Sequence, residues 1–328
     1  MPCLTTNLQA GLESLTLDRL KSILFFLGKG GVGKTTLSVN FAIYLSKNGF
    51  KTYLMSVDPA HNIADLLETK LHNGPNKINS NLVIEELDVD LHLKKTIKKT
   101  EKTLKEQYKY LQILNLDNMF NVIKYSPGLQ EYSIMYGLFE TYNRILPDFD
   151  YLIIDTPPTG LMMRIFSLPQ TNLMWLAKLK ELRSNILGKR DQIAHLDKGT
   201  FKKHKIPTKE SDDMVFKELQ FEIKRTQDIG CIYNSDTSKK VLVMNDDRLS
   251  LLESFKILND LKSFNMNVDL IAINKNITSD FSLGEIEEDY SKLKDYKNLL
   301  IPFYKSKITE DLMLPHMHKM FNHLDICK

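Results

Sequence analysis

A glycine-rich run near the start of the chain has the residue types and the spacing that bind phosphate groups. It reads Gly28-Lys29-Gly30-Gly31-Val32-Gly33-Lys34-Thr35-Thr36. Glycines allow the backbone N–H groups of such a loop to turn inward around phosphate oxygens, and a helix that begins at the loop adds partial positive charge. We expect the Lys34 ammonium to reach the β- and γ-phosphates and the Thr35 hydroxyl to bind Mg²⁺. The run therefore predicts a site for ATP and Mg²⁺, to which every residue of the run belongs.

Two aspartates follow later apolar runs, where they can act on a bound nucleotide. Asp58 comes directly after residues 52–57, and Asp155 comes directly after residues 151–154. The carboxyl ends of parallel strands converge on ligands, so both side chains are expected beside the phosphate loop. We assign to Asp58 the catalytic task of orienting or deprotonating the attacking water, and to Asp155 the binding of Mg²⁺ or its water. The turn that follows Asp155 is placed to sense the γ-phosphate.

The elements that must position these residues are visible as short apolar runs rich in β-branched and aromatic residues. They cover residues 22–27, 52–57, 151–154, 241–244, 270–273 and 299–301. Runs without polar alternation are typical of strands in a parallel sheet that is covered on both faces. Helical patterns over residues 35–47 and 249–264 lie between them. The alternation predicts an α/β fold with a doubly wound, mainly parallel sheet.

Two long segments interrupt this alternation. Residues 94–144 are mostly helical in pattern and far longer than one crossover connection requires, and residues 161–225 follow with an apolar first half and a charged second half. We interpret the chain as a single P-loop ATPase domain over residues 20–328. The two insertions together are expected to form a helical subdomain.

Composition narrows the class of protein. Lys and Arg number 44 against 41 Asp and Glu, so the net charge of +3 gives no general case for nucleic-acid binding. Cys3, Cys231 and Cys327 are too scattered for a disulfide framework or a metal-binding pair, so we interpret them as thiols in a reducing compartment. With no signal-peptide pattern and no apolar run of ~20 residues, the expected location is the cytoplasm, with membranes reached through partners.

The motifs in this order resemble the arsenical-pump and guided-entry (tail-anchored protein targeting) ATPase family of the deviant P-loop class. The resemblance rests on the glycine-rich loop and on two later runs, Ser56-Val57-Asp58-Pro59-Ala60-His61-Asn62 and Asp155-Thr156-Pro157-Pro158-Thr159-Gly160. It implies a homodimer in which Lys29 reaches across to the partner's nucleotide and stabilises transition-state charge. It also implies that Glu253 contacts the nucleotide, that Asn274 reads the adenine and that Pro302 lies near the base.

The chain departs from the family pattern in two respects. The family's eukaryotic targeting factors carry a CxxC pair that binds zinc at the dimer interface, and this chain has no such pair, so no zinc is expected. Leu161-Met162-Met163 follows Gly160 where the family usually has a histidine. The resemblance is therefore firm at the P-loop and at the two aspartates and weaker in the inserted helices.

Three alternative functions stay open, of which the resemblance implies the first two and the third comes from another class of P-loop ATPase. The first is nucleotide-driven capture and delivery of a hydrophobic client helix to a membrane receptor, and it requires an exposed apolar surface. We expect that surface to include Met162, Met163, Phe166, Met174 and Trp175, with Met119, Phe120, Met135 and Leu179 nearby, although a core position is the alternative for each. The second is the ATPase subunit of an arsenite or oxyanion efflux pump, for which no cysteine cluster is present.

The third is a partition-type ATPase that coats DNA. Its support is a lysine run, for which a solvated helix face is the more common explanation. The run consists of Lys94, Lys95, Lys98, Lys99, Lys102 and Lys105. No nucleic-acid partner is therefore expected.

Overall fold

The computed structural model describes residues 20–58, 63–95, 98, 128–196, 206–276, 293–304 and 310–326. The chain divides into two compact units. Unit 1 comprises residues 1–92, 133–166 and 234–328, and unit 2 comprises residues 93–132 and 167–233. Every residue of the candidate site that the sequence predicts belongs to unit 1.

Unit 1 is built on an eight-stranded sheet with the strand order β3-β4-β2-β5-β1-β6-β7-β8. All neighbouring strands are parallel except β3 and β4, which are antiparallel. The predicted α/β fold with a doubly wound, mainly parallel sheet is therefore confirmed. The strands are β1 (Ser22–Leu27), β2 (Thr52–Ser56), β3 (Asn76–Lys77), β4 (Leu82–Glu86), β5 (Tyr151–Asp155), β6 (Ser238–Asn245), β7 (Leu270–Asn276) and β8 (Asn298–Pro302).

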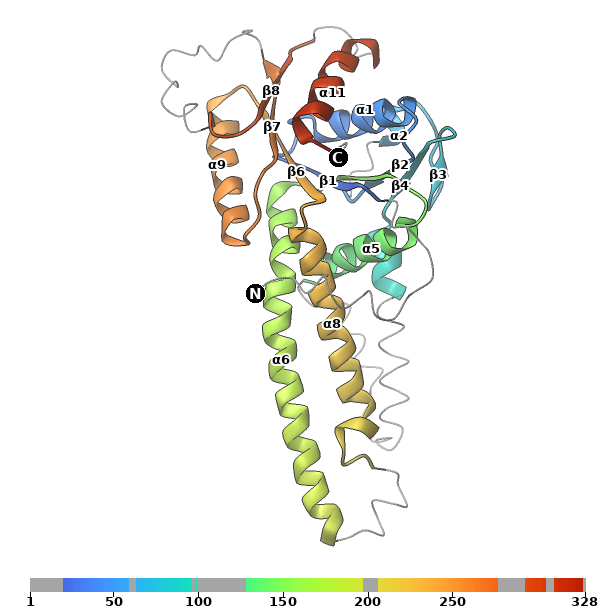
Figure 1. Cartoon of the computed structure of the whole chain (residues 1–328), viewed down its shortest axis with the longest axis vertical. Helices are drawn as coiled ribbons and strands as arrows, with labels where there is room; N and C mark the ends of the chain where they lie inside the picture. Colours follow the sequence, from blue (N-terminus) through green and yellow to red (C-terminus); the bar gives the residue numbers. More distant parts are fainter. Residues whose placement is uncertain are drawn as a thin grey trace. The chain divides into compact units, whose positions relative to one another are not determined.

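Helices cover both faces of this sheet. The connection from β1 through α1 (Lys34–Lys47) to β2 and the connection from β6 through α9 (Arg248–Ser263) to β7 run toward opposite edges. Because parallel crossovers are right-handed, α1 and α9 lie on opposite faces. Helix α11 (Glu310–Leu324) joins α1 in one continuous apolar core, and Figure 1 shows the two helices side by side.

The opposite face is also covered by the unit 1 parts of α5 (Leu129–Ile145) and α6 (Thr159–Leu196). Side chains alternate along β1, so Leu24 and Phe26 face α1 while Phe25 points to the other side. There the Phe25 ring meets Phe166 of α6 edge-on, with 5.3 Å between the ring centroids. The start of α6 is thus fixed directly after β5, beside the predicted site.

Unit 2 contains the remainder of α6 and most of α8 (Met214–Asn234), with a short 3₁₀ helix over Glu210–Asp212. The two helices form an antiparallel hairpin, since Asn172 contacts Thr226 whereas Arg183, further along α6, contacts Asp213 at the start of α8. The Arg183 guanidinium donates to both Asp213 oxygens at 3.0 and 2.6 Å. That bidentate pair is nearly buried and fixes the start of α8 against α6.

The structure corrects part of the predicted client-facing surface. Met162, Met163 and Phe166 are buried in unit 1, where the first turns of α6 pack beneath the sheet, so their predicted exposure is wrong. Met174 and Trp175 lie in unit 2 and are 75% and 63% exposed. Met135 is buried as well, while Met119 and Phe120 lie outside the described residues.

The described residues also bear on the cysteines, the lysine run and the expected lack of a membrane span. Cys231 lies in α8, and the other two cysteines lie outside the described part, so the interpretation of the cysteines as thiols stays a prediction. Lys99, Lys102 and Lys105 of the lysine run also lie outside it. Within the described residues, no helix is long and apolar enough to cross a membrane.

Candidate active site

The phosphate-binding loop connects β1 to α1 and depends on glycine at two positions that the structure explains. Gly28 has φ +145°, and a Cβ there would lie 2.2 Å from the carbonyl oxygen of Val243 on β6. Gly33 has φ +98°, and its Cβ would lie 2.4 Å from the Asn274 amide nitrogen. Both conformations are strained for other residues and both contacts are too close, so the loop fits against β6 and β7 only with glycine there.

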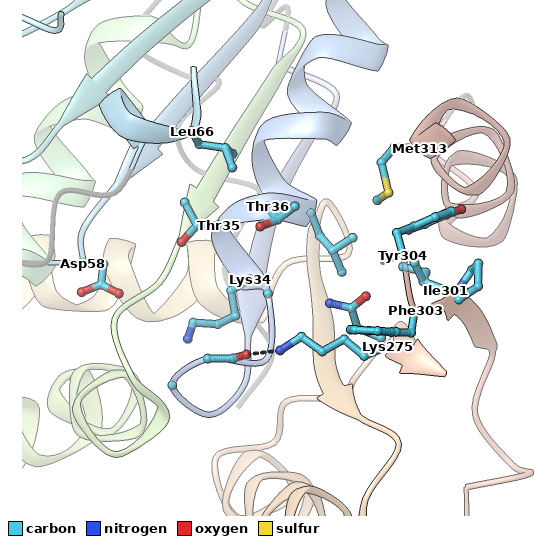
Figure 2. A pocket seen from close by; sticks show the side chains of 16 residues that line it. Lys34, Thr35, Thr36, Asp58, Leu66, Lys275, Ile301, Phe303, Tyr304 and Met313 are labelled. Carbon is cyan, nitrogen blue, oxygen red and sulfur yellow. Dashed lines mark hydrogen bonds between the residues drawn. The ribbon is translucent and has the colours of Figure 1, made fainter. Parts of the chain in front are cut away.

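Side chains hold three carbonyl groups of this loop. The Lys34 ammonium donates to the carbonyl of Lys29 at 3.1 Å, and the Asn274 amide donates to that of Val32 at 2.8 Å. The Lys275 ammonium donates to the carbonyl of Gly31 at 2.9 Å, the interaction drawn as a dashed line in Figure 2. Carbonyls engaged in this way have fixed directions, and the N–H group of the same peptide faces the opposite way.

A cavity of about 380 Å³ lies beside the loop. Figure 2 shows its lining, with the loop residues toward one end and the segment from Ile301 to Tyr304 toward the other. The predicted site residues Gly30, Gly31, Gly33, Lys34, Thr35, Thr36, Asp58, Asn274 and Pro302 all line it. The remaining lining residues, which the sequence reasoning did not single out, are Leu37, Leu66, Lys275, Ile301, Phe303, Tyr304 and Met313.

Asp155 lies where a metal ligand is expected. Its Oδ2 accepts a hydrogen bond from the Thr35 hydroxyl at 2.8 Å and a longer one from Ser56 at 3.5 Å. Its Oδ1 is buried and has no hydrogen-bond partner among the described residues. Burial raises the pKa of this carboxyl to about 6, although Thr35 and Lys34 act in the opposite direction.

These contacts fit the magnesium ion that the sequence motifs imply. Mg²⁺ takes one or two protein oxygens together with water and substrate phosphates, so it needs no cage of several acidic side chains. No group of three or more His, Cys, Asp and Glu side chains that could hold a metal occurs within the described residues. Thr35 and Asp155 are therefore the pair that would hold the ion, and the bare Oδ1 is the atom that its charge would satisfy.

Asp58 lies just after the end of β2 and lines the cavity beside the phosphate loop. The Val57 amide donates to the Asp155 carbonyl at 3.0 Å, and the Asp58 amide to the Ser56 hydroxyl at 3.4 Å, so the ends of β2 and β5 are tied together. Asp58 is half-buried and lines the cavity (Figure 2). Burial lowers the pKa of the Lys34 ammonium, and the negative charges of Asp155 and Asp58 oppose that effect.

Lys29 and Glu253 are brought together, but outside the cavity lining. The Lys29 ammonium lies 3.0 Å from Glu253 Oε1 in the second turn of α9, and both side chains are partly exposed. Within the single chain, the two residues that the resemblance assigns to the nucleotide thus contact each other.

Tyr304 forms the far end of the cavity together with Phe303. Its hydroxyl donates to the carbonyl of Leu312 at 3.2 Å and lies 2.9 Å from His316 Nε2, so α11 fixes the ring. Asn274 and Pro302 pointed to this region from the sequence, and Lys275 and Phe303 are their immediate neighbours. The only signal for Lys275 and Phe303 in the sequence is therefore their position next to Asn274 and Pro302. No residue type on its own identifies a side chain that lines a pocket for a base.

A glycine-rich loop between the first strand and the first helix of a parallel sheet, with acidic residues after two neighbouring strands, defines a P-loop nucleoside-triphosphatase. The sequence model of the anion-transporting ATPase family matches residues 21–305, most of the chain. The chain belongs to this family, which includes the ArsA and GET3 proteins, and it is an ATPase of the family.

Three relatives illustrate the range of the family. A protein of Aquifex aeolicus provisionally named arsenical pump-driving ATPase 2 is 29% identical over 87% of this chain and 92% of its own length. A similarly named protein of Prosthecochloris vibrioformis is 31% identical over 83% of this chain and 68% of its own length. The ATPase GET3 of Komagataella phaffii is 29% identical over 84% and 78%. Proteins named arsenical pump-driving ATPase and a protein named ATPase GET3 thus occur among relatives of comparable similarity.

Proposed function

We propose that this ATPase works as a homodimer that closes around ATP and thereby captures a hydrophobic helix of a client membrane protein, such as a tail-anchored protein, for delivery to a membrane receptor. The observation that supports the proposal is the apolar surface of unit 2. Large apolar side chains are exposed along both of its helices, namely Met174, Trp175, Leu182, Ile193 and Leu196 of α6 and Met214 and Phe221 of α8. Exposed apolar surface of this extent is typical of an interaction site.

These residues are not scattered at random along α6. Leu182 follows Trp175 by about two helical turns, and Ile193 follows Leu182 by about three, so the three side chains share one face. The contacts between Asn172 and Thr226 and between Lys180 and Phe216 set the register of the hairpin. In that register Trp175 lies at the level of Phe221, and Leu182 at the level of Met214. A long client helix would need an apolar strip of this kind. Methionine suits such a strip because its flexible side chain can pack against different partner side chains.

The site residues have distinct tasks in this proposal. The loop from Gly28 to Thr36 binds the phosphates of ATP, and Lys34 neutralises charge on the β- and γ-phosphates. Asp58 orients the attacking water and accepts its proton. Thr35 and Asp155 would hold Mg²⁺, which would supply positive charge to the phosphate oxygens. Asn274 and Pro302 contact the base, and Glu253 lies close enough to Lys29 to respond to the nucleotide.

Lys29 is the residue through which the second subunit acts on the first. A partly exposed ion pair such as that between Lys29 and Glu253 stabilises a protein by only ~0.2–1 kcal/mol. A triphosphate in a closed, water-poor interface attracts a lysine much more strongly. The pair within one chain is therefore compatible with a Lys29 that reaches the partner's nucleotide when the dimer closes.

An arsenite or oxyanion pump subunit is the second candidate, favoured by the names of relatives such as the Aquifex aeolicus protein. Metalloid binding requires clustered thiolates. The chain has three cysteines, and they are scattered along the sequence and form no cluster in it. A partition-type ATPase is a third and weaker candidate. In the first two cases the protein acts in the cytoplasm and meets the membrane through a partner.

The rate of ATP hydrolysis, measured after the addition of an apolar peptide, arsenite or duplex DNA, distinguishes the three candidate functions. The client carrier predicts that a soluble peptide containing one apolar helix of ~20 residues changes the hydrolysis rate, whereas arsenite and duplex DNA do not. Stimulation by arsenite alone would favour the pump subunit. Salt-sensitive stimulation by DNA would favour the partition-type ATPase.

A further inference from the structure

We propose that Lys275 is a positioning residue for nucleotide binding: it clamps the carbonyl of Gly31 and so holds the phosphate loop in the shape that receives the diphosphate part of ATP and ADP. The inference rests on the proposed nucleotide site and adds a residue that neither the motifs nor the comparisons assign. Lys275 follows Asn274 at the carboxyl end of β7. Its ammonium lies 2.9 Å from the Gly31 carbonyl oxygen (Figure 2).

The backbone of β7 is irregular where Lys275 leaves the strand. Ile273 pairs with Leu300 and Asn276 pairs with Pro302, so two residues of β7 stand opposite one residue of β8. A bulge of this kind re-aims a side chain and is frequent beside active sites. Lys275 itself has φ +57°, which is uncommon for a lysine and which occurs where surrounding structure imposes it.

The surroundings hold this conformation from both sides. The Asn276 amide donates to Asp246 at 2.8 Å, and the Phe303 amide donates to the carbonyl of Asn276 at 2.8 Å. On the other side, Asn274 donates to Val32 of the loop. The bulge is therefore anchored before and after Lys275, and its effect is to direct two consecutive side chains to two consecutive carbonyls of the loop.

The chemical consequence concerns the peptide groups of the loop. Each peptide places its N–H and its C=O on opposite sides. A cation that holds the Gly31 carbonyl therefore fixes the N–H of Val32 on the opposite side of that peptide, which is the side where our proposal places the anion. Asn274 does the same for the next peptide through Val32. Binding then requires less reordering of the loop, which raises affinity without any contact between Lys275 and the nucleotide.

This role differs from that of a lysine that contacts the γ-phosphate. A clamp on the loop acts on the phosphates shared by ADP and ATP, so its loss weakens both nucleotides by the same factor. A direct contact to the γ-phosphate acts on ATP alone. Loss of an electrostatic contribution in the transition state lowers kcat instead of raising KM.

The test compares Lys275→Met with Lys275→Arg, and with Lys262→Met as a control on the exposed surface of α9. Binding of ADP and of a non-hydrolysable ATP analogue is measured by calorimetry, and hydrolysis is followed in steady state. We expect Lys275→Met to weaken both nucleotides by about three- to tenfold, as for loss of one exposed charge-assisted hydrogen bond. KM rises, kcat stays within about twofold, and Lys275→Arg restores affinity because it keeps the donor.

Several outcomes would overturn the proposal. Unchanged affinity in Lys275→Met, weaker binding of the ATP analogue alone, or a fall in kcat with unchanged KM would each remove the positioning role. An equal loss in Lys262→Met would reduce the effect to general surface charge. If the unmodified protein bound neither nucleotide, the proposed nucleotide site itself would fail, and this result is distinguishable because it does not involve the variants.

Discussion

Asp58 and Asp155 are two identical side chains in different surroundings, and we propose different roles for them. Asp155 is buried, accepts hydrogen bonds from Thr35 and Ser56, and keeps one oxygen without a partner among the described residues. Asp58 is half-buried and lines the cavity, and its backbone amide donates to the Ser56 hydroxyl. A buried, partly unsatisfied carboxylate suits a metal ion, while a carboxylate at a cavity suits a water molecule.

Replacing Asp58 with Asn tests whether Asp58 acts on water while Asp155 binds the metal ion. The amide keeps the shape of the side chain but cannot accept a proton, so hydrolysis should fall by about 10²- to 10⁴-fold while ATP binding stays within a few-fold. In the matched variant Asp155→Asn, the magnesium concentration that supports half-maximal binding should rise instead. Titrations with ATP and with Mg²⁺ provide the measurement. Normal hydrolysis by Asp58→Asn would exclude it as the base.

At this scale the sequence predicted the residues that motifs define and not the residues that support them. The run from Gly28 to Thr36 is recognisable because phosphate binding demands glycines and a lysine at fixed spacing. The contacts of Lys275 with Gly31 and of Tyr304 with His316 join residues far apart in sequence or depend on a bulge. No local pattern encodes such contacts.

Among the elements, β6 carries a lysine in an unusual environment. Lys240 is buried against the sheet, donates to the carbonyl of Ser238 at 2.8 Å, and lies near the charges of Asp269 and Lys239. Burial lowers the pKa of Lys240 from 10.5 to about 8, and the positive charge of Lys239 adds to the effect, while Asp269 opposes it. β6 therefore contains a group whose protonation is linked to folding.

This linkage predicts a pH dependence of stability. Below about pH 8 Lys240 is protonated in both states, and between about 8 and 10.5 the unfolded chain binds the proton more strongly. The free energy of unfolding should therefore gain a contribution that rises by about 1–3 kcal/mol over this range. Denaturant titrations at several pH values should show that Lys240→Met lacks this rise, while Lys262→Met retains it. An identical pH profile for Lys240→Met would contradict the linkage.

Helix α6 passes from unit 1 into unit 2, and its methionines change role along the way. Met163 is buried under the sheet, and Met174 is exposed on the hairpin. We expect Met163→Asp to lower the free energy of unfolding by about 3 kcal/mol or more, because a charge is buried without a partner. Met174→Asp should change it by no more than about 0.5 kcal/mol. Denaturant unfolding measures the free energy of unfolding of both variants. An equal loss in the two variants would contradict the difference in burial between Met163 and Met174.

The elements were predictable to different degrees. The core strands β1, β2 and β5 carry continuous apolar runs and were predicted nearly to the residue. The edge strands β3 and β4 were missed, because β3 spans only Asn76–Lys77 and β4 ends in Glu85 and Glu86, which break the apolar pattern. In α6, helical spacing of methionine and aromatic residues cannot show where the helix leaves the sheet, so buried and exposed methionines were predicted alike.

For the whole molecule, the central question is whether two chains cooperate on each ATP. Lys29→Ala and Asp58→Asn should each be inactive alone. In a mixed dimer, one site combines its own Asp58 with the partner's Lys29, so an equal mixture should recover about a quarter of the normal rate if subunits exchange freely between two-fold symmetric dimers. Lys29→Ala mixed with the double variant Lys29→Ala/Asp58→Asn is the control that should stay inactive. No recovery despite demonstrated mixed dimers would exclude action across the interface.

Capture of a hydrophobic helix is the most direct test of the proposed carrier function. The ATP-bound Asp58→Asn protein would be mixed with a fluorescent peptide that contains one apolar helix of ~20 residues, and binding would be followed by anisotropy. We predict capture that requires ATP and Mg²⁺, that falls by about tenfold or more when Met174 and Trp175 are both changed to Asp, and that survives the control Gln170→Asp on the same helix. Capture of equal strength without nucleotide, or undiminished capture by the Met174→Asp/Trp175→Asp protein, would contradict the account.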